Sequence, residues 1–403
     1  MQWRRVIKGE VKFAMMLSIH ERLPSVYVHI PFCEVKCGYC DFFSVPRGYE
    51  DFDLQNQYVE ALIREMQGRL EPHRGRVIHS LFFGGGTPSL LDPTLLERIL
   101  HTLRTFLSWG PETEVTLESN PKTVSLEKLR TFRSLGINRL SIGVQSFQDR
   151  FLKTLGRIHS GADARRTVDD ALKAGFENVS CDMIFALPGQ TFEDWQKDLQ
   201  EAISLGTPHL SAYHLTIEGG TAFDGLHRKG KLNLPSEEEG VRCLTWTREA
   251  LKAAGLDAYE ISNFARIGRE SVHNKNYWEY GEYFGFGTAA ASFTKNPNRM
   301  RRTNVRDLKK YVAGQYAGSN DGSSETISPQ LAMGEFCMLG LRMREGIEDE
   351  RFQAEFGCSL SAAFRPQLTK WQQRGWLERG ARSWMLTADG LLFADEVAAS
   401  FLP

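Results

Sequence analysis

Short apolar runs alternate with longer amphipathic segments between residues 25 and 216. The amphipathic segments repeat their apolar residues at helical spacing, and two of them stop at Gly136 and Gly175, a residue type that commonly ends helices. Strands that alternate with helices in this way predict parallel pairing through right-handed crossovers. The runs that we expect to be strands are residues 25–30, 77–83, 114–119, 138–144, 178–185 and 209–215.

Residues with unusual side chains stand at or near the end of each run. They are the cysteine-containing segment after residue 30, GGGTP at 84–88, Glu118 with Asn120, Gln145, Asp182 and His214. In a β/α barrel the active site collects residues from the C-terminal ends of all the strands, whereas an open doubly wound sheet binds ligands at one switch point. Six contributing strands therefore predict an α/β fold built on a partial (βα)6 barrel.

The rest of the chain is organised differently. Residues 217–324 contain a helical pattern, the aromatic stretch HNKNYWEYGEYFGFG and a basic run, and residues 325–403 show helical patterns followed by two short β-like runs. That last order predicts a small winged-helix-like α+β domain. We expect four segments, namely an N-terminal extension (1–24), the barrel core (25–216), a barrel-extending and connecting segment (217–324) and the C-terminal domain (325–403).

The composition is that of a folded protein, with 41% hydrophobic and 25% charged residues in 403. A formal net charge of −1 provides no overall attraction for nucleic acid, so no such partner is expected. No apolar run is long enough to cross a bilayer, and residues 1–24 lack the features of a secretory signal. Seven cysteines, three of them clustered, disfavour a secreted disulfide framework and favour a cytoplasmic location.

Three cysteines, Cys33, Cys37 and Cys40, lie close together in YVHIPFCEVKCGYCDFFS. A structural zinc ion needs four ligands, and His29 is the nearest candidate for a fourth. A C-x-x-C redox pair would leave Cys33 without a role. A [4Fe–4S] cluster usually takes four cysteines, and three would leave one iron with an open coordination position for a small molecule.

The ordered motifs resemble the radical S-adenosylmethionine (SAM) enzymes. Within that superfamily they are most similar to the group of oxygen-independent coproporphyrinogen III oxidases and HemW-type heme chaperones, and closest to the HemW type. The motifs span residues 27–278 and are YVHIPFC, YCDF, GGGTP, ESNP, NRLSIGVQS, LGRIH, DMIFALPGQT and HNKNYW. The C-terminal segment is also similar to that of the group.

The resemblance implies that Cys33, Cys37 and Cys40 hold a [4Fe–4S] cluster whose open iron binds the amino and carboxylate groups of SAM. It also assigns residues to the bound SAM. At the methionyl end, Gly84, Gly85 and Gly86 would let the backbone approach and Thr87 would add a hydroxyl. Glu118 would accept from the amino group of SAM, and Arg157 would bind its carboxylate. Gln145 and Asp182 would bind the ribose, and Tyr27 and Tyr39 would line the adenosyl pocket.

The same resemblance bears on the reaction. Oxidases of the group carry a further cysteine two positions after the third, and Phe42 occupies that place here. This difference, together with HNKNYW, favours a heme chaperone without coproporphyrinogen oxidase activity. The alternative is an oxidase that decarboxylates propionate side chains, with Tyr27 and His29 as candidate catalytic residues. A radical enzyme that acts on heme itself lies behind both, so enzymatic turnover is left open.

Heme binding requires an axial ligand, an apolar slot and cations for the propionates. His273 is the candidate ligand, although a histidine beside aromatic residues is more often structural. The basic run from Lys295 to Lys310 is the candidate propionate site. The aromatic residues beside His273 are Tyr277, Trp278, Tyr280, Tyr283, Phe284 and Phe286. The expected partners are heme, apo-hemoprotein recipients, an electron donor and, as a further candidate, a second copy of the chain.

Overall fold

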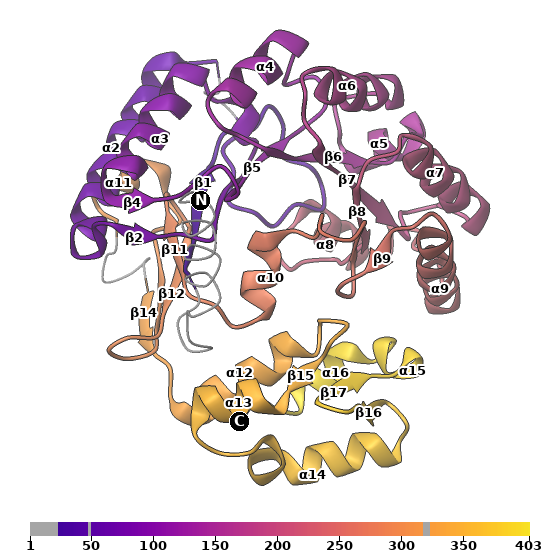
Figure 1. Ribbon diagram of the computed structural model, residues 1–403. Coiled ribbons are helices and arrows are strands. Elements are labelled where there is room, and N and C mark those ends of the chain that lie inside the picture. The colour runs from indigo at the N-terminus through magenta and orange to yellow at the C-terminus, as the bar shows by residue number, and fades with distance from the viewer. Residues whose placement is uncertain (1–22, 47–49, 317–322) are drawn as a thin grey trace, which may run out of the picture.

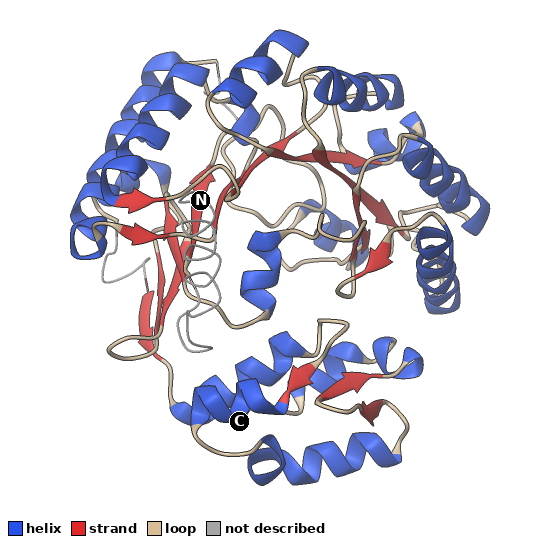
Figure 2. Cartoon of the chain, in the orientation of Figure 1, coloured by secondary structure: helices blue, strands red, loops and turns tan. Residues whose placement is uncertain are grey.

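The computed structural model describes residues 23–46, 50–316 and 323–403. The N-terminal extension expected over residues 1–24 lies almost entirely outside the described residues. Figure 1 shows a strongly curved sheet with helices along its outer side and a smaller unit beneath it. Figure 2 shows that this smaller unit is mainly helical.

Six parallel strands form the centre of the sheet and confirm the predicted partial (βα)6 barrel. They are β1 (Ser25–Ile30), β3 (Ser80–Gly85), β5 (Glu114–Ser119), β6 (Arg139–Gln145), β7 (Asn178–Phe185) and β8 (His209–His214). The second strand begins later than the sequence indicated, because β2 (Arg76–Val77) pairs separately with β4 (Leu107–Ser108).

Later segments extend both edges of this sheet. β11 (Tyr283–Phe286) pairs in parallel with β1, and β10 (Asn263–Ala265) pairs antiparallel with β8. The remaining edge strands are β12 (Ala291–Thr294), β13 (Met300–Thr303) and β14 (Ser323–Thr326) beyond β11, and β9 (Asp257–Ala258) beyond β10. The two edges do not meet in the described sheet, so the barrel is open on one side.

Helices follow the strands and cover the outer side of the sheet (Figure 1). The principal ones are α2 (Phe52–Leu70), α3 (Pro93–Phe106), α4 (Leu126–Ser134), α6 (Gly161–Lys173), α7 (Phe192–Ser204) and α9 (Glu237–Ala253). Reciprocal capping boxes start three of them, at Ser160, Thr191 and Ser236. Gly136 and Gly175 have φ angles of 99° and 88°, which confirms the predicted helix stops.

Shorter elements complete the barrel region. α10 (Val272–Trp278) lies on the inner side of the sheet, where Ser80 of β3 bonds to His273 and Glu114 of β5 accepts from two backbone amides of this helix (Figure 1). The other short helices are α5 (Asp149–Leu155), α8 (Ala222–His227), α11 (Leu308–Val312), η1 (Glu71–His73) and η2 (Pro88–Leu90).

The C-terminal unit has the helix and strand order of a winged-helix-like module. Its helices are α12 (Pro329–Gly340), α13 (Asp349–Phe356), α14 (Leu360–Gln373), α15 (Ala388–Leu391) and α16 (Ala394–Ala399). Its sheet contains β15 (Ile347–Glu348), β17 (Ser383–Leu386) and β16 (Leu377–Arg379), in that order. This unit has its own hydrophobic core around residues such as Phe352 and Trp371.

Period-two alternation gives the central strands two different faces. Val26, Val28 and Leu117 point outward and belong to the large core beneath the helices. Glu118 and Asp182 stand at intervening positions, on the inner face. The inner face therefore carries the polar side chains, which is the condition for a binding site inside the open barrel.

Polar contacts hold the C-terminal unit against the barrel region. Arg342 donates to Glu260 at 3.3 Å, and the Arg351 guanidinium donates to the Glu279 carbonyl at 2.9 Å. Tyr280, which follows α10, packs into the C-terminal core. In the part of the chain that the structure describes, no helix has the length and apolar character needed to span a bilayer.

The buried carboxylate of Glu65 on α2 fixes the edge strands to the barrel. It accepts from the Gly287 amide at 3.0 Å, the Tyr311 hydroxyl at 2.6 Å and the Asn304 amide at 2.8 Å, and it pairs with Arg69 at 2.5 Å. Gly287, Asn304 and Tyr311 all come from segments that follow β11, so one side chain of α2 links the first quarter of the chain to the segments around β12 and β13.

We expect Glu65→Ala to lower the free energy of unfolding by about 3–5 kcal/mol, because it leaves several buried donors unpaired. Glu60→Ala is the matched control on the same helix, since its ion pair with Arg98 is exposed and worth about 0–1 kcal/mol. Urea unfolding of both variants measures the difference. Equal losses would contradict the role given to Glu65.

Candidate functional site

The three clustered cysteines lie on the loop that follows β1. Backbone bonds from Cys33 to the Val45 carbonyl and from Gly38 to the Leu155 carbonyl hold the loop, at 3.1 Å each. All three thiols are free of disulfides, and Cys33 is the most buried of them. Burial raises the pKa of Cys33, and it raises that of Cys40 to about 11.

The glycine turn after β3 passes directly over the start of this loop. A Cβ atom on Gly86 would lie 2.6 Å from the Phe32 carbonyl oxygen, so only glycine permits this approach. Gly85 has a φ of 119°, and a Cβ atom there would lie 2.5 Å from the His29 ring. The turn thereby delivers the buried Thr87 to Cys33, with 3.3 Å between Oγ1 and Sγ.

A chain of hydrogen bonds runs from this turn across the strand ends. Asn120 donates to Thr87 Oγ1 at 2.8 Å, which leaves the Thr87 hydroxyl proton for Cys33. Arg157 donates to Asn120 Oδ1 at 2.5 Å, to the Gly143 carbonyl at 2.8 Å and to Cys37 Sγ at 3.6 Å. Asn120 lies in the ESNP motif, but the sequence predicts no role for it. Its position directly after β5 was the feature from which a role at the site could have been inferred.

Arg157 provides the positive charge beside the thiols. Burial lowers the pKa of its guanidinium, but Tyr39 and Cys37 outweigh that effect and raise the pKa overall. Tyr39 itself packs against Phe223 with 6.4 Å between ring centroids, and burial raises the pKa of its phenol. A permanently charged planar group beside the thiols suits a carboxylate ligand or the negative charge of a thiolate cluster.

Two half-buried carboxyl groups lie deeper on the inner face. Glu118 Oε2 accepts from the Gly85 amide at 3.1 Å, and burial together with the charge of Asp182 raises the pKa of Glu118 to about 8. Asp182 accepts from Ser141, Ser180 and Ser211 at 2.6–2.8 Å. Burial raises the pKa of Asp182, although these hydroxyls oppose the rise. Asp182 was expected to bind the ribose of SAM. Three serine hydroxyls already occupy most of the acceptor positions of its carboxylate.

Gln145 stands where β6 breaks its register with β7. The shift falls between Ile142 and Gln145, and Gln145 has a φ of 66°, in the left-handed region that a non-glycine residue rarely adopts. Its side-chain nitrogen lies near Gly143. The irregularity aims this side chain at the same end of the barrel as Asn120 and Arg157.

His29 uses both of its ring nitrogens. Nε2 bonds to the Phe43 carbonyl at 2.8 Å and Nδ1 bonds to the Tyr27 hydroxyl at 3.1 Å. A carbonyl only accepts, so Nε2 carries the proton and Nδ1 accepts from Tyr27. Burial lowers the pKa of His29 to about 4, so the ring is neutral. Both nitrogens are therefore occupied in this arrangement, and neither is available as the fourth zinc ligand.

His273 is likewise enclosed, and both of its ring nitrogens have partners within the protein. Its Nδ1 bonds to Ser80 at 2.8 Å and its Nε2 to Tyr277 at 2.9 Å, while burial lowers its pKa to about 3. It is 1% exposed and stacks on Phe82. A bond to heme iron would first have to break one of these hydrogen bonds, so the observed arrangement is that of a structural histidine.

The aromatic stretch around His273 divides between two faces. Tyr277, Trp278, Tyr280 and Tyr283 border one pocket. Phe284 and Phe286 point the other way, into the large core, because successive residues of β11 alternate between the faces of the sheet. The six aromatic residues therefore do not form one slot.

The basic run from Lys295 to Lys310 is extensively paired. Lys295 and Arg299 both contact Glu355 at 2.8 Å, and Arg301 pairs with Glu325 and Glu335. These ion pairs attach the run to the C-terminal unit and to β14. Its first cations are consequently engaged within the protein rather than presented to a ligand.

The donor set of the cysteine loop fits an iron–sulfur cluster, because thiolates are the usual ligands of such clusters. Three thiols lie within eight positions, and the Arg157 guanidinium lies beside Cys37. A cavity of about 20 Å³ beside the loop is lined by residues that include Cys37, Thr87, Asn120 and Arg157. Thiol, hydroxyl, amide and guanidinium groups thus meet at one end of the barrel.

Comparison with known proteins connects both parts of the chain to one group. The family model described as Radical SAM superfamily matches residues 27–202, and the one described as HemN C-terminal domain matches residues 327–393. The chain is 35% identical over 388 residues to heme chaperone HemW of Bacillus subtilis, covering 94% of this chain and 99% of that protein. It is 37% identical to heme chaperone HemW of Synechocystis, covering 88% and 86%.

A solved structure shares the fold over nearly the whole chain. Coproporphyrinogen III oxidase (HemN) from Escherichia coli matches with a TM-score of 0.80 and covers 98% of this chain and 93% of that chain. The two sequences are 22% identical. The match establishes a common architecture for the barrel and the C-terminal unit together.

The raised pKa of Glu118 leads to a prediction about the pH dependence of the free energy of unfolding. Its folded-state pKa of about 8 exceeds the unfolded value of 4.5, so the stability that it contributes is present at low pH and is lost as the pH rises through 8. We expect the parent to lose about 1.5 kcal/mol more than Glu118→Gln between pH 6.5 and 8. Urea unfolding at these pH values measures the difference, with the exposed Glu127→Gln as control. Parallel profiles for parent and Glu118→Gln would contradict the prediction.

Proposed function

Because the chain belongs to the HemW family within the Radical SAM superfamily, we propose that it is a heme chaperone that binds heme and transfers it to apo-hemoproteins. The proposal includes a cytoplasmic location, an electron donor as a further partner and a second copy of the chain as a candidate one. The observation that carries it is the length of the match. The relative in Bacillus subtilis is covered over 99% of its length, so barrel and C-terminal unit are shared as one protein.

Membership of the superfamily implies a [4Fe–4S] cluster and SAM. Cys33, Cys37 and Cys40 would hold the cluster, which supplies a single electron when bound. Arg157 would bind the SAM carboxylate, because its guanidinium is fixed by Asn120 and Gly143 beside the thiols. Glu118 would accept from the amino group beside the Gly85 amide. Thr87, Gln145 and the ring of Tyr39 border the same end of the barrel.

The residue two positions after the third cysteine supports a chaperone. Phe42, which stands where oxidases of the group have a further cysteine, is 67% exposed. It contributes no thiol and makes no part of a closed wall. The additional thiol of the oxidases therefore has no counterpart at this position.

One observation favours the oxidase as a second candidate function. Tyr27 and His29 are joined by a hydrogen bond of 3.1 Å, and the neutral imidazole and phenol form an ordered pair beside the glycine turn. Such a pair can hold or pass a proton near a reacting propionate. The proposed chaperone does not require that chemistry, so product analysis separates the two functions.

The test uses anaerobically reconstituted protein with cluster and SAM. We expect heme to be captured with a shift of its absorption spectrum and to pass to an apo-hemoprotein, while coproporphyrinogen III remains unchanged by product chromatography. Cys33→Ala is a control that removes one proposed ligand of the cluster. Release of carbon dioxide with formation of protoporphyrinogen would overturn the chaperone proposal and establish the oxidase.

Asn120 offers a test of the proposed SAM site. Asn120→Ala removes the bonds that orient Arg157 and Thr87, so we expect SAM to bind about 5–30-fold more weakly, equivalent to about 1–2 kcal/mol. Equilibrium binding to reconstituted protein measures this, with iron content as the control for an intact cluster. Ser125→Ala, which removes only the cap of α4, is a comparison variant at the same end of the barrel. Unchanged SAM affinity in Asn120→Ala would refute the positioning role.

A further inference from the structure

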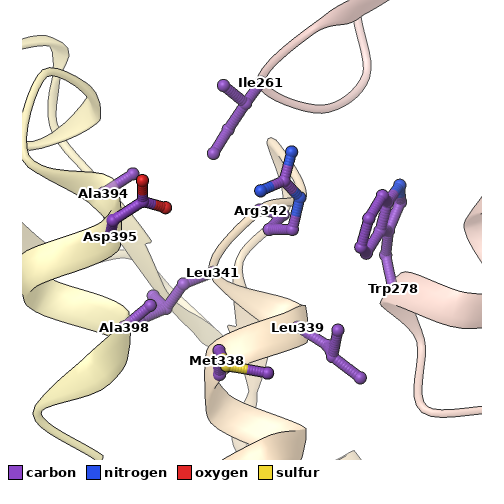
Figure 3. Close-up of a pocket in the computed structure, with 9 residues that line it drawn as sticks. All are labelled: Ile261, Trp278, Met338, Leu339, Leu341, Arg342, Ala394, Asp395 and Ala398. Atoms are coloured by element: carbon purple, nitrogen blue, oxygen red, sulfur yellow. The ribbon is translucent and has the colours of Figure 1, made fainter. Parts of the chain in front are cut away.

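A two-lobed cleft separates the barrel region from the C-terminal unit. The larger lobe has a volume of about 470 Å³ and the smaller about 190 Å³. Both are lined by Trp278 of α10 and by Met338 and Leu339 of α12. Figure 3 shows these three side chains in the smaller lobe, with Leu339 directed toward the Trp278 ring. We call the two lobes together the interdomain cleft.

The larger lobe has the volume and the lining of a site for a mainly apolar small molecule. Its barrel wall includes the rings of Tyr27, Tyr277, Tyr283 and Phe293, and α12 supplies the opposite wall with Met338. Ligand sites of about 300–1,000 Å³ with mainly aromatic walls are typical of small molecules and cofactors. Methionine suits such a wall because its thioether is adaptable and can ligate heme iron without losing a proton.

Three buried donors without a hydrogen-bond partner belong to residues that line this cleft. They are the Trp278 indole nitrogen, the Tyr280 hydroxyl and Nε of Arg342. Tyr280 is only 3% exposed. An unpaired buried donor destabilises a protein, so it calls for a partner such as water or a ligand with acceptor atoms. Together with the mainly apolar lining, these donors favour a ligand that carries oxygen acceptors at its edge.

Arg342 is the group best placed to bind a carboxylate. Its Nη2 donates to Glu260 at 3.3 Å, and its guanidinium lies 4.5 Å from the centroid of the Trp278 ring. These contacts fix the plane of the guanidinium, and Nε has no hydrogen-bond partner. Figure 3 shows Arg342 among the residues that line the smaller lobe. Asp395 lines the same lobe, but it is exposed, so water and salt screen its charge.

We propose that heme is held in the interdomain cleft, with its macrocycle in the larger lobe between Tyr283 and Met338 and one propionate at Arg342 in the smaller lobe. This inference rests on the proposed function and adds the location of the cargo. It keeps several of the aromatic residues near His273 but not His273 itself as a ligand, because that histidine is enclosed by Ser80 and Tyr277. The Arg301 guanidinium also lines the larger lobe but is paired with two acids.

The location places the cargo beside the cofactor end of the barrel. Tyr27 lines the larger lobe, bonds through its hydroxyl to His29, and His29 bonds to the Phe43 carbonyl of the cysteine loop. Heme in the cleft and SAM at the strand ends would therefore lie on two sides of the same pair of residues. In that arrangement, Tyr27 and His29 would connect the heme site to the SAM site within the same barrel.

A variant that fills the cleft tests the location. Leu339→Trp occupies the junction of the two lobes, and we expect it to weaken heme binding at least about 10-fold in the reconstituted full-length protein. Leu392→Trp, at an exposed position of the same unit, should bind heme as the parent does. SAM affinity and iron content should remain equal in all three proteins. Parent-like heme affinity of Leu339→Trp would overturn the proposed site while leaving the chaperone function intact.

A second measurement distinguishes a propionate contact of Arg342 from a purely structural role of this residue. We expect the parent to bind heme about 10-fold more tightly than heme dimethyl ester, and Arg342→Gln to bind the two equally. Arg344→Gln, an exposed neighbour, should keep the parent's preference. Retention of that preference by Arg342→Gln would refute the propionate contact. Absence of heme binding by the parent itself would refute the proposed function together with this inference.

Discussion

The close approach of the glycine turn to the cysteine loop is the constraint on which the site depends. Gly86 lies so near the Phe32 carbonyl that no side chain could be accommodated, and this contact brings Thr87 to Cys33. From there Asn120 and Arg157 extend the network to Cys37. Parallel strands place their C-terminal ends along one edge, and the turn then joins the separate ends into one network of thiols and donors.

The six central strands and their helices followed from the sequence because each has a long apolar run and a clear helical partner. The edges were less evident. β12 and β13 are four residues each, contain polar residues and pair antiparallel, so their pattern is short and ambiguous. β11 contains only the last part of the aromatic stretch, and the alternation of side chains along this strand places Tyr283 and Phe284 on opposite faces of the sheet. The composition of the stretch alone therefore could not show which of its aromatic residues line the same pocket.

The candidate site was predictable in its residues but not in its connections. The cysteines, the glycine turn, Glu118 and Arg157 were all identified from motifs, and the structure brings them to the same end of the barrel. The link through Asn120 depends on side-chain geometry between strands that are distant in sequence. The enclosure of His273 by Ser80 and Tyr277 has the same origin, since neither contact leaves a signal in a linear pattern.

Tyr27 is shared by two compartments, because its ring borders the interdomain cleft and its hydroxyl anchors His29 behind the cysteine loop. A side chain shared in this way couples the two compartments only if it has more than one position. An occupant on one side that favours one position of the phenol then raises the affinity for an occupant on the other side that favours the same position, and the effect is reciprocal. The two compartments are thus linked through one residue of β1.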